Sequence, residues 1–265
     1  MKKLLLILIA LIVLTSCSST QDDKTIKIGA SITPHAEILN QAKELLKEEG
    51  YTLEVVEFTD YVQPNVSLHD GSLDANYFQH QPYLDTFNVE RNWDLVSVGG
   101  IHYEPFALYA GKSTDLANIA DGASIGIPND GTNEGRALFL LESLGLIKLK
   151  EGTGFNATIL DIAENPKQLQ IIELEAAQLP KSLPDLDFAI INGNYALEAG
   201  LSAKNDGLAA ESLDSKATET YVNVVAVRKE DQNSEKIKAL VDVLKSAEIK
   251  AWIETEYDGA VVPYK

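Results

Sequence analysis

The sequence predicts an α/β protein whose sheets are mostly parallel. Short apolar runs rich in β-branched residues alternate with helical patterns from Thr25 to Ser246, an alternation typical of layered α/β folds. The chain has 265 residues, enough for one large or two medium domains, and no Pro/Gly-rich linker divides it. A second domain would therefore arise by chain crossover.

The first elements illustrate this pattern. Thr25–Ile32 is expected to form a strand, and His35–Glu49 a helix because its apolar residues recur at helical spacing. Thr33-Pro34 is expected to supply the N-cap and a first-turn proline of that helix, and Gly50 to end it. Further strands are expected at Leu53–Phe58, Leu95–Val98, Phe106–Ala110, Ala123–Ile127, Leu169–Ile172, Phe188–Ile191 and Val222–Val227. Further helices are expected at Gln81–Arg91, Asn133–Leu144, Asn192–Ala199 and Ser234–Ser246.

The N-terminus reads as an export signal. A basic start, an apolar run from Leu4 to Leu14 and small residues precede Cys17, the only cysteine. The run is too short to span a bilayer, which takes about 20 residues. Leu14-Thr15-Ser16-Cys17 resembles the bacterial lipoprotein signal, which implies cleavage after residue 16 and lipidation of Cys17. An ordinary secretory signal is the alternative. Residues 18–23 are small and polar and are expected to form a tether.

The charge balance excludes two classes of partner. The chain has 40 acidic residues against 22 lysines and arginines, a net charge of −18. Nucleic-acid binding needs clustered lysine and arginine. Anionic membrane surfaces likewise attract basic segments. The composition therefore argues against nucleic acid and against membrane adhesion beyond the lipid.

A polar loop that runs into a helix contains the strongest chemical signal, Arg136. The segment is Pro128–Arg136, and the N–H groups and positive dipole end of a helix N-terminus suit a carboxylate. An arginine there can add a two-pronged hydrogen bond to the same carboxylate. Spacing alone leaves a surface salt bridge with an acidic neighbour as an equal alternative.

An aromatic cluster occupies Leu73–Asp85, an unusual composition for a loop, and the expected helix Gln81–Arg91 begins within this segment. Tyr77, Phe78, His80 and Tyr83 crowd together there. Such a cluster would line a pocket for an apolar side chain or a thioether. Core packing beneath a loop is the alternative, because aromatic side chains are so often part of the core.

Metal binding is a competing function. His35, His80, His102 and Glu104 are the residues that would gather into a zinc or manganese site. Against this, no pair has the i, i+4 spacing of a helical site, and no histidine-rich loop is present. A serine hydrolase is disfavoured, because Ser124 lies in an apolar strand run and every histidine precedes it.

Eight blocks, in the same order as in a known family, span nearly the whole mature chain. They are Phe58–Tyr61, Asp74–Leu84, Pro128–Arg136, Gly145–Lys150, Asn165–Lys167, Glu173–Pro180, Ile191–Ala196 and Tyr221–Asn223. By these blocks the chain resembles the NlpA/MetQ family, the methionine-binding lipoproteins of ABC importers.

The resemblance implies a type II periplasmic-binding-protein fold, in which a ligand cleft lies between two α/β lobes. Two crossing segments are placed near Phe106–Tyr109 and Asn223–Val227. Residues 24–107 and 226–265 would form the first lobe and residues 108–225 the second, after a signal peptide (1–16) and a lipidated tether (17–23). Hinge closure would bury the ligand.

The same resemblance implies an amino-acid site without catalytic residues. Arg136 would bind the ligand carboxylate, Asn192 and Asn223 would hydrogen-bond its carboxylate and amino ends, and Glu104 would face the ammonium. The other expected ligand-binding residues are Tyr61, Phe78, His80 and Tyr83 around the side chain, together with His102 and Asn133.

The implied ligand is L-methionine or a close relative, with no cofactor and no metal. The implied partners are an ABC permease and its ATPase, reached by a monomer anchored through its lipid outside the cytoplasm. Tyr77, Lys181 and residues 218–220 depart from the family pattern. D-methionine, a methionine-containing dipeptide and another apolar amino acid therefore stay open as ligands.

Overall fold

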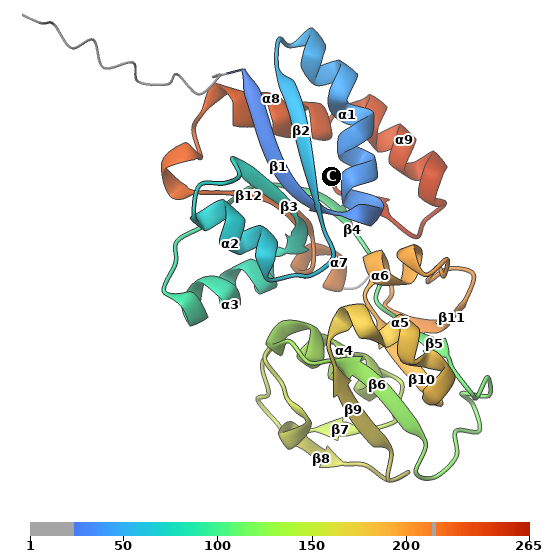
Figure 1. The fold of residues 1–265 in the computed structure, drawn as a ribbon. Helices are drawn as coiled ribbons and strands as arrows, with labels where there is room; N and C mark the ends of the chain where they lie inside the picture. The colour runs from blue at the N-terminus through green and yellow to red at the C-terminus, as the bar shows by residue number, and fades with distance from the viewer. Residues whose placement is uncertain (1–23, 214–215) are drawn as a thin grey trace, which may run out of the picture.

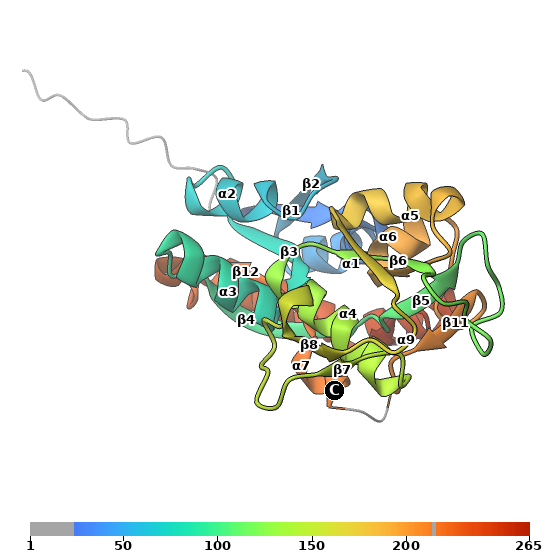
Figure 2. The ribbon, with the colours of Figure 1, turned by 90° about the horizontal axis from the view of Figure 1, so that it is seen from below.

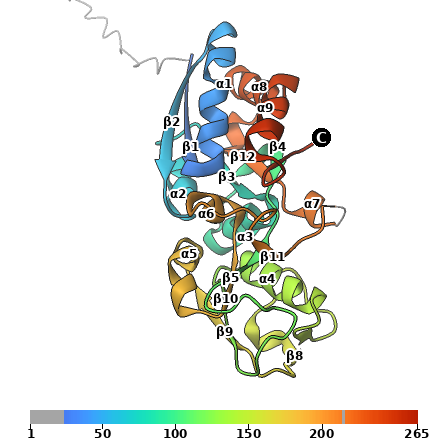
Figure 3. The same ribbon diagram turned by 90° about the vertical axis from the view of Figure 1, so that its right-hand side faces the viewer.

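A computed structural model describes residues 24–213 and 216–265, so the signal, Cys17 and the tether lie outside the described residues. Two α/β lobes are visible in Figure 1: one built from both ends of the chain, the other from its middle. The side view in Figure 3 places one lobe above the other, with connecting segments between them. The expected two-lobed α/β architecture is confirmed, but the expectation of mostly parallel sheets is wrong, because both larger sheets mix parallel and antiparallel pairings. Within the described ranges, no helix has the length and apolar character needed to cross a membrane.

The first lobe contains a six-stranded sheet in the order β13-β4-β12-β3-β1-β2. Its strands are β1 (Thr25–Ser31), β2 (Thr52–Phe58), β3 (Ala75–His80), β4 (Val96–Tyr103), β12 (Asn223–Val227) and β13 (Val262–Pro263). The strands β1, β2 and β3 pair in parallel, whereas β12 lies antiparallel between β3 and β4. A strand from near the C-terminal end of the sequence thus lies in the middle of a sheet formed mostly by strands from the N-terminal part.

The second lobe contains a five-stranded sheet in the order β11-β5-β10-β6-β9. Its strands are β5 (Ala107–Ala110), β6 (Ser124–Pro128), β9 (Gln170–Leu174), β10 (Phe188–Ile191) and β11 (Gly207–Ala210), and β7 (Lys148–Leu149) pairs separately with β8 (Ile162–Glu164). The carboxyl ends of parallel strands are where α/β folds bind ligands. β6 and β10 pair in parallel and end at Pro128 and Ile191, next to the residues expected to bind a ligand.

Helices cover both sheets. The α-helices are α1 (Glu37–Glu48), α2 (Gln63–His69), α3 (Gln81–Arg91), α4 (Gly131–Ser143), α5 (Leu179–Ser182), α6 (Gly193–Glu198), α7 (Ala217–Thr220), α8 (Glu235–Leu244) and α9 (Ala247–Tyr257). Short turns of other helix types are η1 (Ile32–Ala36), η2 (Ile159–Asp161), η3 (Ala176–Gln178), η4 (Leu183–Asp185) and η5 (Lys229–Asp231). Buried side chains of α1, α8 and α9 pack into one core with β1 and β12. In the view from below, α3 of the first lobe lies beside α4 of the second (Figure 2).

The connections between the lobes lie a few residues from their expected positions. The chain changes sheets between Tyr103 and Ala107, and again between Ala210 and Asn223. The expected second crossing, Asn223–Val227, is instead β12, a fully buried strand of the first sheet. Its apolar run fits a strand buried on both faces better than an exposed connection.

In the aromatic segment Leu73–Asp85, the part before the expected helix is the strand β3 and not a loop, whereas the helix α3 begins at Gln81 as expected. All six residues of β3 are buried, and β3 has a neighbouring strand on each side. A strand buried on both faces lacks the polar–apolar alternation that reveals strands. Its polar residues Asn76 and Gln79 are satisfied by hydrogen bonds of 2.8 Å to Asn65.

Other differences are local. Thr33 has extended backbone dihedrals and does not cap α1, which begins at Glu37; its hydroxyl instead donates to the Glu37 carboxylate at 2.8 Å. The expected helix end at Gly50 is confirmed, since Gly50 has a left-handed φ of 84°. Ser246 begins a second helix, α9, which the sequence reading missed together with α2.

Candidate functional site

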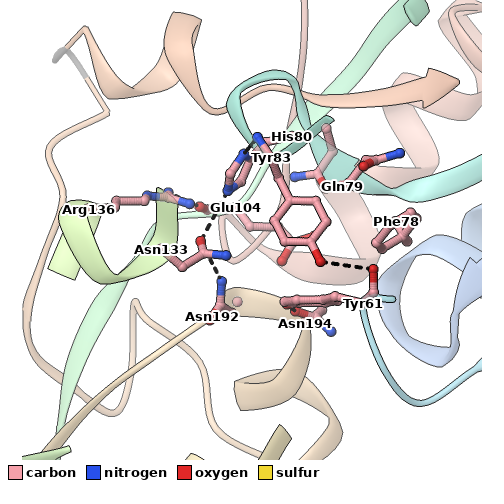
Figure 4. Close-up of a pocket in the computed structure, with 12 residues that line it drawn as sticks. Tyr61, Phe78, Gln79, His80, Tyr83, Glu104, Asn133, Arg136, Asn192 and Asn194 are labelled. Carbon is pink, nitrogen blue, oxygen red and sulfur yellow. Dashed lines mark hydrogen bonds between the residues drawn. The ribbon is translucent and has the colours of Figure 1, made fainter. Parts of the chain in front are cut away.

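A cavity lies between the two lobes, with an empty volume of about 350 Å³ that includes space open to solvent. It is lined by Tyr61, Phe78, Gln79, His80, Tyr83, Glu104 and Asn223 of the first lobe and first connection, and by Asn133, Arg136, Asn192, Gly193 and Asn194 of the second lobe (Figure 4). Of the residues expected at a ligand site, only His102 does not line this cavity. Side chains from distant parts of the chain therefore share one space.

Hydrogen bonds join the two lobes beside this cavity. The Tyr61 hydroxyl in the first lobe donates to the Asn194 side-chain oxygen in the second at 2.5 Å. The Tyr195 hydroxyl of α6 donates to the carbonyl of Thr59 at 3.3 Å. Each bond joins the two lobes, so these contacts hold the lobes together beside the cavity.

The helix α4 presents its first turn to the cavity. Asp130 caps it by accepting from the backbone N–H of Asn133 at 3.1 Å and from its side-chain amide at 2.8 Å. The expected helix start near this loop is confirmed, but Asp130 already accepts one of the N–H groups expected to face a ligand. Gly135 allows close packing, because a Cβ there would lie 2.1 Å from the carbonyl oxygen of Phe155.

Arg136 is buried, so its interpretation as a surface salt bridge is wrong. Its Nε and Nη2 donate to the Glu211 carboxylate at 2.8 and 2.5 Å, and Nη2 also donates to the carbonyl of Glu104 at 3.0 Å. The guanidinium lies 4.2 Å from the ring centroid of Tyr221. Glu211 therefore occupies the two-pronged edge that was expected for a ligand carboxylate. Nη1 donates to no side chain or carbonyl in the described ranges.

Opposing effects act on this ion pair. Burial alone would lower the pKa of Arg136, but the Glu211 carboxylate more than offsets this effect and the pKa lies above its usual value. Burial raises the pKa of Glu211, yet Arg136 and its hydrogen bonds bring that pKa below the usual value. Both groups are therefore charged at neutral pH.

His80 is held in one tautomer. Its Nδ1 accepts from the backbone N–H of Tyr83 at 3.2 Å, so Nε2 carries the proton and donates to the side-chain oxygen of Asn133 at 3.1 Å. The Asn192 amide donates to the same oxygen at 3.0 Å. Burial lowers the pKa of His80 from 6.5 to about 3, and nearby Arg136 acts in the same direction.

Two amide atoms in the cavity wall lack partners. Asn192 Oδ1 and Asn194 Nδ2 are buried, and neither has a hydrogen-bond partner in the described part of the chain. Buried polar groups are almost always paired, and an unpaired one costs about 1–3 kcal/mol. The two residues thus offer one acceptor and one donor to a ligand that has both kinds of group.

Glu104 forms the acidic end of the cavity. Its Oε1 lies 2.7 Å from Nε2 of His102 and 3.5 Å from Nε2 of His35. The Tyr77 hydroxyl contacts the other ring nitrogen of His102. Burial raises the pKa of Glu104, and it lowers the pKa values of His35 and His102 to about 4 and 3. Gly193 makes room for this carboxylate, because a Cβ there would lie 2.7 Å from Oε2.

The four-residue metal site that was weighed as an alternative is not assembled. His35, His102 and Glu104 offer ligand atoms that lie within 4.8 Å of one another, and they are the candidate cation ligands. His80 points elsewhere and bonds to Asn133. His102 behind the cavity positions Glu104 by a hydrogen bond, which explains why His102 does not line the cavity itself.

The opposite wall is aromatic. The ring centroid of Tyr61 lies 5.9 Å from that of Phe78 and 5.8 Å from that of Tyr83, both with inclined planes. The Tyr83 hydroxyl donates to the backbone carbonyl of Tyr61 at 3.0 Å. These tilted and edge-on arrangements are favourable between aromatic rings, and thioethers also pack well against ring edges.

Sequence reasoning missed four residues of this region. Gln79, Gly193 and Asn194 lie next to expected residues and contribute to the lining. Gly193 and Asn194 directly follow Asn192 in the sequence, and Gln79 lies between Phe78 and His80. These positions could have indicated that the three residues belong to the site. Glu211 had no such signal, because its partner Arg136 is 75 positions away in the sequence.

The burial of neutral His80 predicts acid sensitivity of the fold. Its pKa falls on folding, so the unfolded chain binds a proton that the native chain does not, and stability is lost as pH drops below about 6.5 toward about 3. We expect the loss in unfolding free energy between pH 7.5 and 5.0 to be about 2 kcal/mol smaller in His80→Gln than in the parent. Urea unfolding of both proteins at the two pH values measures these losses in unfolding free energy. Identical losses in the two proteins would refute the assignment of a neutral His80.

Two α/β lobes that close on a shared cavity define a two-lobed binding protein of the type II periplasmic-binding-protein fold. The chain belongs to the NlpA lipoprotein family, whose model matches residues 26–265. The D-methionine-binding lipoprotein MetQ of Salmonella typhimurium is 41% identical over 259 residues, covering 96% of this chain and 94% of the relative.

Solved structures give the same assignment. A protein from Ruminococcus gnavus is 56% identical with a TM-score of 0.90, covering 91% of this chain and 100% of that one. A nutrient binding protein from Burkholderia cenocepacia, solved bound to methionine, is 46% identical with a TM-score of 0.86 and the same coverage. Both similarities extend over the two lobes and the connections between them.

Proposed function

We propose that the chain is the lipid-anchored substrate-binding protein of an ABC importer and that it captures methionine. The observation that carries this proposal is one cavity between the lobes with a cationic group, Arg136, and an anionic group, Glu104, in its wall. A buried zwitterion needs both of its charges compensated, because unpaired buried charge is heavily penalised. An α-amino acid meets this requirement.

The ligand carboxylate would lie against Nη1 of Arg136, the edge of the guanidinium that Glu211 leaves available. The unpaired Asn194 amide adds a donor. The ammonium would face Glu104 and the unpaired Asn192 oxygen, with Asn223 nearby in the lining. Charge-assisted hydrogen bonds at both ends would orient the ligand.

The ligand side chain would extend toward Tyr61, Phe78 and Tyr83, whose rings form the apolar wall. A thioether suits this wall, because sulfur makes favourable contacts with ring edges. The Burkholderia relative was solved with methionine, which supports the same ligand here. We propose the L form. The name of the Salmonella relative supports D-methionine as the alternative, beside a methionine-containing dipeptide or another apolar amino acid.

The proposed location follows from Cys17. A lipid on this residue would anchor the acidic, monomeric protein outside the cytoplasm, close to its permease and ATPase. Six tether residues, 18–23, would span about 20 Å when extended. The receptor would therefore stay near the membrane and still reach the permease.

Thermal unfolding of the purified chain tests this function against metal delivery, which the His35, His102 and Glu104 cluster favours as a second candidate. We expect L-methionine at 100 times its Kd to stabilise the chain by about 2.7 kcal/mol, with or without chelator. Zinc is expected to give no chelator-sensitive stabilisation. Stabilisation by zinc alone, reversed by chelator, would contradict the proposal and support metal delivery.

A further inference from the structure

Glu211 joins the two connections between the lobes. It directly follows β11, where the chain leaves the second sheet. Its backbone N–H donates to the carbonyl of Phe106 at 2.9 Å, and its carboxylate accepts from the N–H of Phe106 at 3.2 Å. The Tyr103 hydroxyl at the end of β4 donates to the same carboxylate at 2.5 Å. Tyr103 and Phe106 border the first connection, so Glu211 links both connections.

The same carboxylate fixes the ligand-facing arginine. It holds Nε and Nη2 of Arg136 in a two-pronged ion pair, and the side chains of both partners are largely buried, with 5% and 11% exposure. A planar fork fixes the plane of the guanidinium as well as its position. The remaining donor, Nη1, is thereby directed away from Glu211, which does not itself line the cavity.

We propose that Glu211 is a positioning residue that directs Arg136 toward the ligand carboxylate and links ligand capture to the connections between the lobes. This rests on the proposed amino-acid function. Without the fork, the guanidinium is still held near the rings of Phe106 and Tyr221, at 4.7 and 4.2 Å from their centroids, but the direction of Nη1 is no longer fixed.

Calorimetric titration with L-methionine and L-methioninamide tests this role, because only methionine has the carboxylate that contacts Arg136. We expect Glu211→Gln to reduce the methionine-to-methioninamide affinity ratio at least threefold and to leave methioninamide binding unchanged. Glu211→Asp keeps the charge but shifts it by one methylene, and we expect the same fall in the ratio. Tyr103→Phe removes one contact of Glu211 but leaves the fork, and is the matched control with an unchanged ratio.

Each outcome decides the proposal. An unchanged ratio in Glu211→Gln, with both ligands weakened equally, would assign Glu211 a purely structural role and overturn the proposal. A higher affinity for methionine in that variant would also overturn it, because Glu211 would then compete with the ligand. A parent chain that does not bind methionine would refute the proposed function, and the Glu211 proposal with it.

Discussion

Replacing Arg136 with alanine is expected to weaken methionine binding by about tenfold to 150-fold. A charge-assisted hydrogen bond contributes roughly 1.5–3 kcal/mol, and each 1.4 kcal/mol corresponds to a factor of ten in Kd. The fold is also expected to lose stability, because Glu211 would be left as a buried charge without its partner. Breaking such a pair costs about 3–5 kcal/mol.

Two further variants separate binding from stability. In Arg136→Ala combined with Glu211→Gln, the uncompensated charge is gone, so we expect thermal stability to recover in part while methionine binding stays weak. Arg91→Ala changes an exposed arginine on α3 and is the control expected to bind as the parent does. Calorimetry with L-methionine measures all three proteins. An unchanged affinity in Arg136→Ala would disprove the site geometry.

Replacing Glu104 with glutamine is expected to weaken methionine binding by about tenfold. The amide keeps the shape of the side chain and an oxygen for the hydrogen bond from His102, now 2.7 Å from Oε1. What it removes is the negative charge that faces the ammonium, and a charge-assisted bond is about twice as strong as a neutral one. Calorimetry with L-methionine measures the loss.

The pH profile gives a second readout of Glu104. Burial raises its pKa, so the carboxyl becomes neutral at a higher pH than usual. Methionine affinity of the parent is therefore expected to fall as the pH is lowered through this raised pKa, and this dependence should be absent in Glu104→Gln. Deaminated methionine, 4-(methylthio)butanoate, lacks the ammonium that would pair with Glu104, so its affinity is expected not to fall in Glu104→Gln. A Glu104→Gln variant with parental affinity and pH profile would remove Glu104 from the site.

The parts of the fold that depend on local signals could be predicted from the sequence. The helix Gln81–Arg91 was expected at its observed bounds, and Gly50 ends α1 as expected. β3 could not be recognised, because burial on both faces removes the alternation of a strand. The position of β12 depends on pairing with β3 and β4, far earlier in the sequence, which no local pattern indicates.

The candidate site divides in the same way. Arg136 was found because a polar loop precedes its helix, and Phe78 and Tyr83 because aromatic residues cluster in the sequence. The partner of Arg136 was not found, because Glu211 reaches it only through the fold and its surroundings resemble an ordinary polar connection. The burial of Arg136 also shows that it is not part of a surface salt bridge. This burial depends on the packing of both lobes, which the sequence pattern around Arg136 does not show.

The most direct test is native mass spectrometry of the purified chain, followed by chiral analysis of the ligand released on denaturation. The account predicts one bound molecule with the mass of methionine, in the L form, and its loss in Arg136→Ala. A zinc or manganese adduct in place of an amino acid would contradict the account, as would a bound molecule without both an amino group and a carboxylate.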